Sequence, residues 1–288
     1  MIQNRMKRKI ITLACLAFSV LMSAQSLYVG TYNLRVLSGN DEAKGDRWAK
    51  RCQVICDQLN FEHPDIFGTQ EAVASQLHDI LNVLDDYAFI GVGRDDGKEA
   101  GEFSAILYNK KRLKLLDSGN FWLSEHPEKP GIGWDAAYTR ICTYGKFKDI
   151  NSRKTFFFIN LHMDHRGVVA RRESAKLVIS KIQSLSNGLP VILTGDFNVD
   201  QRDEVYQIFT SSGLLKDSYT SSRIRFAENG TFNAFNPDRK SDSRIDHVLV
   251  SPSFSVDRYG ILTDGYWTAD SVRHLPSDHY PVLVRLSF

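Results

Sequence analysis

Polar side chains follow several apolar segments of the chain, at the points where strands are expected to end. Asn33 follows the segment LYVGTY, Glu71 follows DIFGTQ, and Asp196 follows PVILTG. The full set comprises Asn33, Glu71, His162, Asp196, Asn198, Asp246, His247, Asp278 and His279. In layered α/β proteins, sites collect at the strand ends on one side of a sheet. We therefore expect these side chains to share one cleft.

The residue types describe a hard-cation site with acid–base groups. Oxygen ligands suit Mg²⁺, Mn²⁺ or Ca²⁺, and Mg²⁺ usually takes one or two carboxylates, which leaves positions for phosphate oxygens. A positioned aspartate or histidine can remove a proton from water near neutral pH. The sequence has neither a P-loop nor a G-x-G-x-x-G fingerprint after a strand. Each residue alone also fits a structural role, such as an Asx turn for Asp196-Phe197-Asn198.

Hydrophobic periodicity predicts the elements that must position these residues. Helices are predicted over residues 48–59, 75–84, 168–185 and 203–212. Extended segments are predicted over residues 27–33, 65–71, 103–108, 113–121, 138–147, 155–161, 190–194, 245–250, 254–262 and 282–286. This mixture of β-α-β units and strand runs predicts a layered α/β or α+β domain.

The first 24 residues have the pattern of a cleavable signal peptide. Four basic residues between positions 5 and 9 precede an apolar stretch over 10–22, and the small residues Ser23 and Ala24 follow it. The apolar stretch is too short for a stable membrane span. An uncleaved anchor and lipidation at Cys15 are the alternatives. We therefore expect residues 25–288 to form one exported domain, located in the periplasm or outside the cell.

The net charge bears on nucleic-acid binding, and the cysteine content bears on the core. Removal of residues 1–24 takes away four positive charges and no negative ones, which changes the formal net charge from +2 to −2. Proteins that grip duplex phosphates without sequence preference usually carry a strong positive face. The net charge of −2 therefore argues against a protein that binds nucleic acid tightly and without sequence preference. Cys52, Cys56 and Cys142 remain, and they are expected to be small buried apolar residues.

Six short motifs occur in an order that resembles the endonuclease/exonuclease/phosphatase family. They are Thr31-Tyr32-Asn33, Gln70-Glu71, Leu161-His162, Gly195-Asp196-Phe197-Asn198, Ile245-Asp246-His247 and Ser277-Asp278-His279. The resemblance extends over residues 27–284. It implies a four-layer α/β (α+β) sandwich, with two mixed β-sheets flanked by helices, as in deoxyribonuclease I.

The resemblance also implies roles for single residues. Glu71 looks like the family's principal metal ligand, with Asn33 and Asp278 as further ligands or as partners of the ligands. Asp196 resembles the aspartate that orients or deprotonates the attacking water. Asn198 resembles the neighbouring residue that positions the phosphate.

Two carboxylate–histidine pairs follow from the same resemblance. His279 resembles the histidine that donates to the scissile phosphate or acts as acid or base, and Asp246 is expected to hold it. Glu102 and His162 resemble a second pair, of the deoxyribonuclease I type. A histidine that acts on phosphate needs its other ring nitrogen fixed. We therefore expect a carboxylate–nitrogen distance of about 2.6–3.2 Å in each pair.

Three arginines are candidate substrate-binding residues. Arg35 follows Asn33-Leu34 as in deoxyribonuclease I, and Arg140 resembles an arginine that contacts phosphate. Arg171 lies near the start of a predicted helix, where amide groups and an arginine can bind phosphate. A solvated, charged helix face is the alternative for this segment.

The leading prediction is a divalent-metal-dependent hydrolase of phosphate esters that uses Mg²⁺ or Mn²⁺, with Ca²⁺ as a further candidate. Phosphodiesters, such as nucleic acid or a phospholipid head group, are the expected substrates of a monomeric enzyme. A phosphomonoesterase acting on nucleotides or inositol phosphates is the alternative, because one fold serves all these reactions. The alternative from another class is a non-catalytic phosphoester-binding protein. Such a protein need not keep Glu71, Asp196, Asn198 and His279 together.

Overall fold

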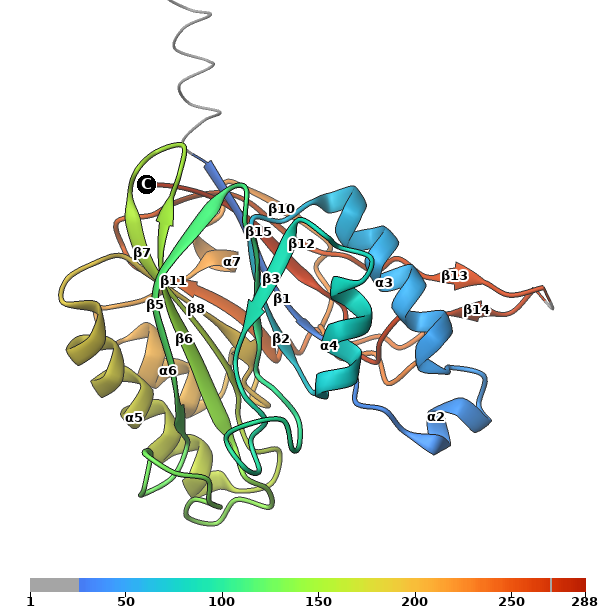
Figure 1. Cartoon of the computed structure of the whole chain (residues 1–288), viewed down its shortest axis with the longest axis horizontal. Helices are drawn as coiled ribbons and strands as arrows, with labels where there is room; N and C mark the ends of the chain where they lie inside the picture. Colours follow the sequence, from blue (N-terminus) through green and yellow to red (C-terminus); the bar gives the residue numbers. More distant parts are fainter. Residues whose placement is uncertain (1–25, 270) are drawn as a thin grey trace, which may run out of the picture.

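Two β-sheets pack face to face at the centre of the protein (Figure 1). The computed structural model describes residues 26–269 and 271–288, so the predicted signal peptide lies outside the described residues and remains a prediction. One sheet contains β1 (Ser26–Asn33), β2 (Ile66–Gln70), β3 (Tyr87–Ile90), β4 (Ile106–Asn109), β10 (Ile224–Phe226), β12 (Ser255–Ile261) and β15 (Val282–Ser287). The other contains β5 (Leu113–Trp122), β6 (Ile141–Asp149), β7 (Thr155–His162), β8 (Val191–Asp196), β9 (Lys216–Asp217) and β11 (Asp246–Val250).

Both sheets mix parallel and antiparallel pairs. The strand orders are β10-β12-β15-β1-β2-β4-β3 and β5-β6-β7-β8-β11-β9. Strands β1 and β2 run parallel, as do β7 and β8, whereas β11 is antiparallel to β8. Parallel neighbours end at the same edge of a sheet, so the carboxyl ends of these strands are brought together.

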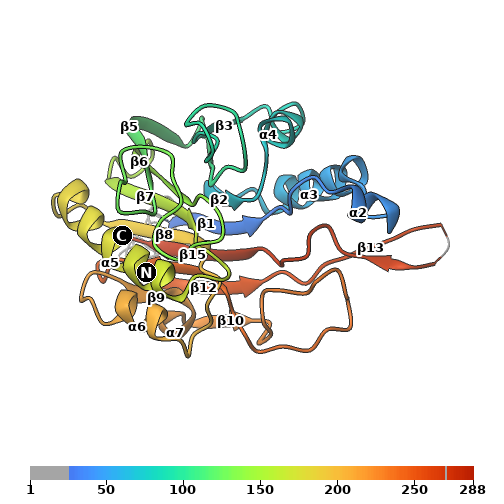
Figure 2. The same ribbon diagram turned by 90° about the horizontal axis from the view of Figure 1, so that it is seen from below.

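Helices cover the outer faces and complete four layers (Figure 2). Helices α3 (Trp48–Glu62) and α4 (Ala74–Leu81) pack on the seven-stranded sheet, and α5 (Val168–Ser186) and α6 (Glu204–Thr210) pack on the six-stranded sheet. The short elements are α2 (Gly39–Ala43), α7 (Ser218–Ser221), β13 (Tyr266–Trp267) and β14 (Arg273–His274). The predicted sandwich of two mixed sheets flanked by helices is confirmed.

A polar bridge joins the two sheets beneath the strand ends. The Asn160 amide nitrogen donates to the carbonyls of Thr69 and Ala105, at 2.9 Å each, and its oxygen accepts from Gln70 at 2.7 Å. Gly68 faces this amide, and a Cβ at that position would overlap the Asn160 side chain. Since buried polar groups need partners, the bridge fixes the relative position of the sheets at the site.

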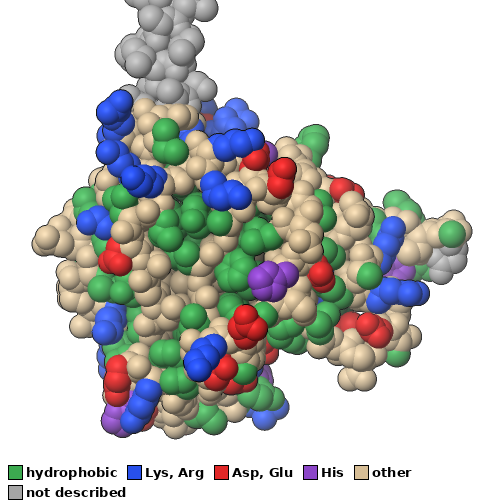
Figure 3. All heavy atoms as spheres, in the orientation of Figure 1, with side chains coloured by type: hydrophobic (Ala, Val, Ile, Leu, Met, Phe, Trp, Pro, Cys, Tyr) green, Lys and Arg blue, Asp and Glu red, His purple; other side chains and the backbone are tan. Residues whose placement is uncertain are grey.

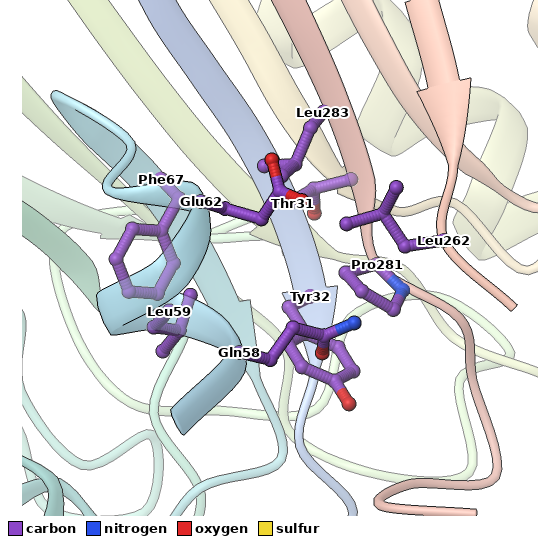
Figure 4. A pocket seen from close by; sticks show the side chains of 9 residues that line it. All are labelled: Thr31, Tyr32, Gln58, Leu59, Glu62, Phe67, Leu262, Pro281 and Leu283. Atoms are coloured by element: carbon purple, nitrogen blue, oxygen red, sulfur yellow. The ribbon is translucent and has the colours of Figure 1, made fainter. Parts of the chain in front are cut away.

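The space between α3 and its sheet is nearly filled. Figure 4 shows the side chains that line it, which come from α3, β1, β2, the residue that follows β12 and the segment around β15. Its volume is only about 10 Å³, which is close to the space that one water molecule occupies. Helix α3 is therefore closely packed against its sheet.

Several predicted strand boundaries are wrong. Strand β4 begins at Ile106, because the Phe103 amide donates to the Ala72 carbonyl outside the sheet. Strand β6 begins at Ile141, because the Tyr138 amide donates to Asp164 Oδ2. The short strands β3, β9, β10, β13 and β14 and the helices α2 and α7 were not predicted. Elements of two to five residues carry too little periodicity to be detected.

Within residues 26–269 and 271–288, none of the helices combines the length and the apolar character needed to cross a membrane.

Candidate active site

One cleft of about 500 Å³ contains most of the predicted site residues. It lies at the end of the sandwich where β1, β2, β7 and β8 terminate, opposite the end where Ser26 pairs with Ser287. It is lined by Arg35, Val36, Glu71, Arg94, Glu102, Tyr138, Arg140, His162, His165, Asp196, Asn198, Phe232, Ile245, Asp278 and His279. The expectation that His162 and His279 share one cleft with Glu71, Asp196 and Asn198 is confirmed.

Strand register places three of these residues side by side. His162 at the end of β7 lies opposite Asp196 at the end of β8, and Asp246 at the start of β11 lies opposite Asp196 on its other side. Residues paired across neighbouring strands have adjacent side chains. This pairing across β7, β8 and β11 explains why motifs far apart in the sequence lie next to one another.

Glu71 is held by its neighbours in a fixed orientation. It follows β2 directly with a left-handed backbone conformation, φ 66°, which is uncommon for a residue other than glycine. Its Oε1 accepts from Asn33 Nδ2 at 3.0 Å, and its Oε2 accepts from the Val36 amide at 3.1 Å. Asn33 Oδ1 accepts from the Arg35 amide at 3.0 Å. Asn33, predicted as a metal ligand or a partner of one, is placed here as the buried partner of Glu71.

Nitrogen donors surround the Asp196 carboxylate. Its Oδ1 accepts from the Asn198 amide at 2.9 Å, so the predicted Asx turn does form. Its Oδ2 accepts from Asn33 Nδ2 at 3.0 Å and lies 3.5 Å from His162 Nε2 and 3.7 Å from His279 Nε2. Burial, together with the charge of Asp246, nevertheless raises the pKa of Asp196 to about 7. An aspartate poised near neutrality can exchange a proton with water.

The predicted contact between Asp246 and His279 is confirmed. His279 Nδ1 lies 2.9 Å from Asp246 Oδ2, and both side chains are buried. Burial alone would lower the pKa of His279, but the charges of Asp246 and Asp196 outweigh it and raise that pKa well above its ordinary value. These neighbours therefore favour the protonated form of His279, whose Nε2 lies 3.7 Å from Asp196 Oδ2.

The predicted contact between Glu102 and His162 does not form. The Glu102 carboxylate instead makes a bidentate pair with Arg94, with oxygen–nitrogen distances of 2.6 and 2.9 Å. Burial raises the pKa of Glu102 to about 7, although the charge of Arg94 opposes this. Burial, Arg140 and Arg94 lower the pKa of His162 well below its ordinary value, so its ring is neutral.

Glu71, Asp196 and His279 form a cluster that could hold a metal ion, with ligand atoms within 4.8 Å of one another. Burial and the charge of Glu71 raise the pKa of Asp278, which also lines the cleft. The raised pKa values of Asp196 and Asp278 reflect a local excess of negative charge, which a bound cation would offset. Carboxylate oxygens suit a hard cation better than an imidazole nitrogen, so Glu71 and Asp278 are the candidate ligands among these residues.

Two of the three predicted arginines line the cleft. Arg35 Nε lies 2.9 Å from Asp41 Oδ2, and its Nη1 lies 3.5 Å from Asp278 Oδ2. Arg140 Nε lies 3.3 Å from Asp164 Oδ2, and within the described residues its buried Nη1 has no hydrogen-bond partner. Arg171 is not among the lining residues.

The Arg171 side chain binds the loop that precedes α5. Its Nη1 donates to the Asp164 carbonyl at 2.9 Å, which ties the start of α5 to the preceding loop.

The cleft also contains residues that sequence reasoning did not select, namely Val36, Arg94, Tyr138, His165, Phe232 and Ile245. His165 and its neighbour Asp164 lie in the loop that precedes α5. Arg94 lies in a glycine-bearing loop with no chemical motif. Tyr138 was not selected as a site residue, because its position was predicted to be the start of a strand.

Comparisons with known proteins agree with this geometry. The sequence profile of the Endonuclease/Exonuclease/phosphatase family matches residues 30–279. The structure of a mannosyl-6-phosphatase from Bacteroides thetaiotaomicron VPI-5482 is similar, with 51% sequence identity and a TM-score of 0.90; the match covers 91% of this chain and 100% of that chain. An endonuclease/exonuclease/phosphatase from Bacteroides vulgatus is 35% identical, with a TM-score of 0.83 and coverage of 91% and 99%.

A more distant relative is a probable RNA exonuclease from Saccharomyces cerevisiae. It is 26% identical over 184 residues, which cover 59% of this chain and 35% of the yeast protein. The matched region thus spans about a third of that longer relative.

Proposed function

The chain belongs to the endonuclease/exonuclease/phosphatase family, and from this premise we propose that it is a divalent-metal-dependent phosphatase acting on a sugar monophosphate. The observation that carries the proposal is the 51% identity to the mannosyl-6-phosphatase, which extends over 91% of this chain. The sequence motifs alone favoured a phosphodiester and left the monoester as the alternative. The identity reverses that order, because the yeast exonuclease is far less similar.

The charges of the cleft support a phosphate monoester, which carries up to two negative charges. Arg35, Arg140 and His279, whose pKa is raised, bring positive charge to the lining of the cleft. The unpartnered Arg140 Nη1 is a buried donor that a phosphate oxygen can satisfy. Fixed donors of this kind stabilise the charge that develops on the phosphoryl oxygens.

A cation bound by Glu71 and Asp278 would supply further positive charge to the phosphate oxygens. The chain's own groups account for the proton transfers. Asp196 orients the attacking water and accepts its proton as the new oxygen–phosphorus bond forms. His279 donates from Nε2 to the phosphate, while Asp246 holds Nδ1 and so fixes the ring. The ester oxygen leaves with its bonding pair and takes the proton that His279 Nε2 donates, and an alcohol and inorganic phosphate are released. The proton held by Asp196 then returns to His279, whose Nε2 lies 3.7 Å from Asp196 Oδ2.

The test is a substrate panel with the purified protein, with and without EDTA. The panel contains mannose 6-phosphate, methyl phosphate, bis(p-nitrophenyl) phosphate and single-stranded DNA. We expect kcat/KM to be at least about 100-fold higher for mannose 6-phosphate than for either diester. EDTA should abolish turnover, and Mg²⁺ or Mn²⁺ should restore it. Full turnover in excess chelator would refute metal dependence, and faster hydrolysis of the diesters would refute the monoester assignment.

A further inference from the structure

We propose that Tyr138, Arg94 and Glu102 form a subsite that binds the sugar ring of the substrate, next to the groups that act on its phosphate. The inference rests on the function proposed above and deepens it by assigning the recognition of the leaving group. These three residues line the same cleft as Asp196 and His279. None of the three has a part in the proton transfers described above.

Tyr138 offers an aromatic surface whose position is fixed. Its backbone amide donates to Asp164 Oδ2 at 3.3 Å, and the His165 ring stacks on it with centroids 5.7 Å apart and an interplanar angle of 20°. Even so, 49% of Tyr138 remains exposed. A supported ring with an open surface suits the C–H face of a sugar, since aromatic side chains combine apolar area with a polar end.

Arg94 and Glu102 provide polar groups in one rigid plane. The pair is bidentate, and each carboxylate oxygen keeps lone-pair capacity beyond its bond to Arg94. The backbone holds the pair in place, because Trp122 Nε1 donates to the Arg94 carbonyl at 2.7 Å and the Arg94 amide donates to the Glu102 carbonyl at 3.1 Å. Sugar hydroxyls both donate and accept, so they match a carboxylate that lies next to a guanidinium.

Arg140 connects this subsite to the phosphate end of the cleft. The guanidinium carbons of Arg94 and Arg140 lie 5.5 and 5.9 Å from the centre of the Tyr138 ring. Arg140 lines the same cleft as His162, Asp196 and His279. A phosphate held by Arg140 would therefore have its esterified carbon beside Tyr138.

A nucleotide is the competing ligand, because a base can also stack on tyrosine. The partly exposed carboxylate of Glu102 favours the sugar. A sugar ring presents several hydroxyl donors to Glu102, whereas a stacked base directs its edges away from the surface below it. AMP is therefore included in the test as a competing substrate.

The experiment compares specificity ratios of Tyr138→Ala, Glu102→Gln and the wild-type protein. The ratio is kcat/KM for mannose 6-phosphate divided by kcat/KM for methyl phosphate, which has no ring. We expect each variant to lower the ratio about tenfold or more, since lost contacts to the ring affect only the sugar ester. The control is Phe61→Ala, which removes an exposed aromatic ring (88% exposed) on α3, and it should keep the wild-type ratio.

Three results would overturn the subsite. The first is an equal loss on both esters, which would place Tyr138 and Glu102 in the chemical step. The second is a change of the ratio by Phe61→Ala as large as that by Tyr138→Ala. The third is a preference of the wild-type protein for AMP that Tyr138→Ala removes.

Failure of the proposed function is a separate outcome. If the wild-type protein hydrolyses no monoester, the binding of mannose 6-phosphate is measured by isothermal titration calorimetry. Weaker binding to Tyr138→Ala than to Phe61→Ala supports the subsite even then, and equal binding overturns it.

Discussion

The pKa values of two histidines in one cleft are shifted in opposite directions, because their neighbours differ. His279 lies beside the carboxylates of Asp246 and Asp196, and its pKa is raised. His162 is buried near Arg140 and Arg94, and its pKa is lowered. Environments that push the pKa values of two titratable groups apart usually separate their roles. We assign the donation of a proton to His279, and His162 is left as a neutral ring beside Asp196.

Replacement of Asp196 by asparagine tests the chemistry at this scale. Asp196→Asn keeps the shape of the side chain but removes its charge and its capacity to accept a proton. We expect kcat to fall by roughly two or more orders of magnitude, with an unchanged circular dichroism spectrum and unfolding midpoint.

The matched control for this variant is Asp242→Asn. Asp242 is a largely exposed aspartate that pairs with Arg202 on the surface, and its replacement should leave kcat unchanged. A turnover of Asp196→Asn close to that of the wild-type protein would mean that Asp196 has only a structural role.

At the scale of elements, the Asp164 carboxylate joins two loops beside the cleft. Asp164 Oδ1 accepts from the amides of Arg166 and Gly167, at 2.9 and 2.7 Å. Its Oδ2 accepts from the Tyr138 amide and from Arg140 Nε, at 3.3 Å each. The loop before β6 and the loop before α5 are thus joined through a single carboxylate. Both loops carry residues of the proposed sugar subsite or its support.

The stability of this junction should depend on pH. Burial raises the pKa of Asp164, but hydrogen bonds from the amides of Gly167 and Arg166 and the charge of Arg140 outweigh it, so the pKa is lowered in the folded protein. The stabilisation is therefore complete at neutral pH and is lost as the pH falls below the value of about 3.9 for an unfolded aspartate. We expect Asp164→Asn to lower the free energy of unfolding by about 1–3 kcal/mol at pH 7.

Urea unfolding of Asp164→Asn and the wild-type protein at pH 7 and pH 3.5 measures this effect. The difference between them should shrink at the lower pH, where the wild-type carboxylate begins to lose its advantage. The control Asp242→Asn should change stability by no more than about 0.5 kcal/mol at either pH. A difference for Asp164→Asn that is the same at both pH values would contradict the assigned role of the charge.

The same loops mark the limit of what the sequence could predict. Asn33, Glu71 and Asp196 could be found because each follows a buried strand, and strand ends meet when the sheet forms. The partner of Glu102 could not be found in this way, since Arg94 reaches it through a loop that has no periodicity. Tyr138 was assigned to a strand because nothing in the local pattern reveals that its amide bonds to Asp164.

At the scale of the whole molecule, positive and negative side chains are mixed within the cleft. Its lining includes the arginines Arg35, Arg94 and Arg140 and the carboxylates Glu71, Glu102, Asp196 and Asp278. Lys and Arg side chains on the face drawn in Figure 3 gather toward the upper end, and below them they are mixed with Asp and Glu. Within the cleft, Arg35 and Arg94 are already paired with carboxylates. This distribution suits a small anionic substrate and offers little to a long duplex.

The last prediction follows from this distribution and concerns salt. The slope of log K against log salt concentration is about −0.9 per neutralised phosphate of duplex DNA. Since few cleft cations are free of carboxylate partners, binding of a 20-base-pair duplex, followed by fluorescence anisotropy between 50 and 200 mM NaCl, should give a slope no steeper than about −2. The slope itself reports the number of phosphates that the protein neutralises. A slope near −5 would require an extended basic surface, and it would favour a nuclease over a sugar phosphatase.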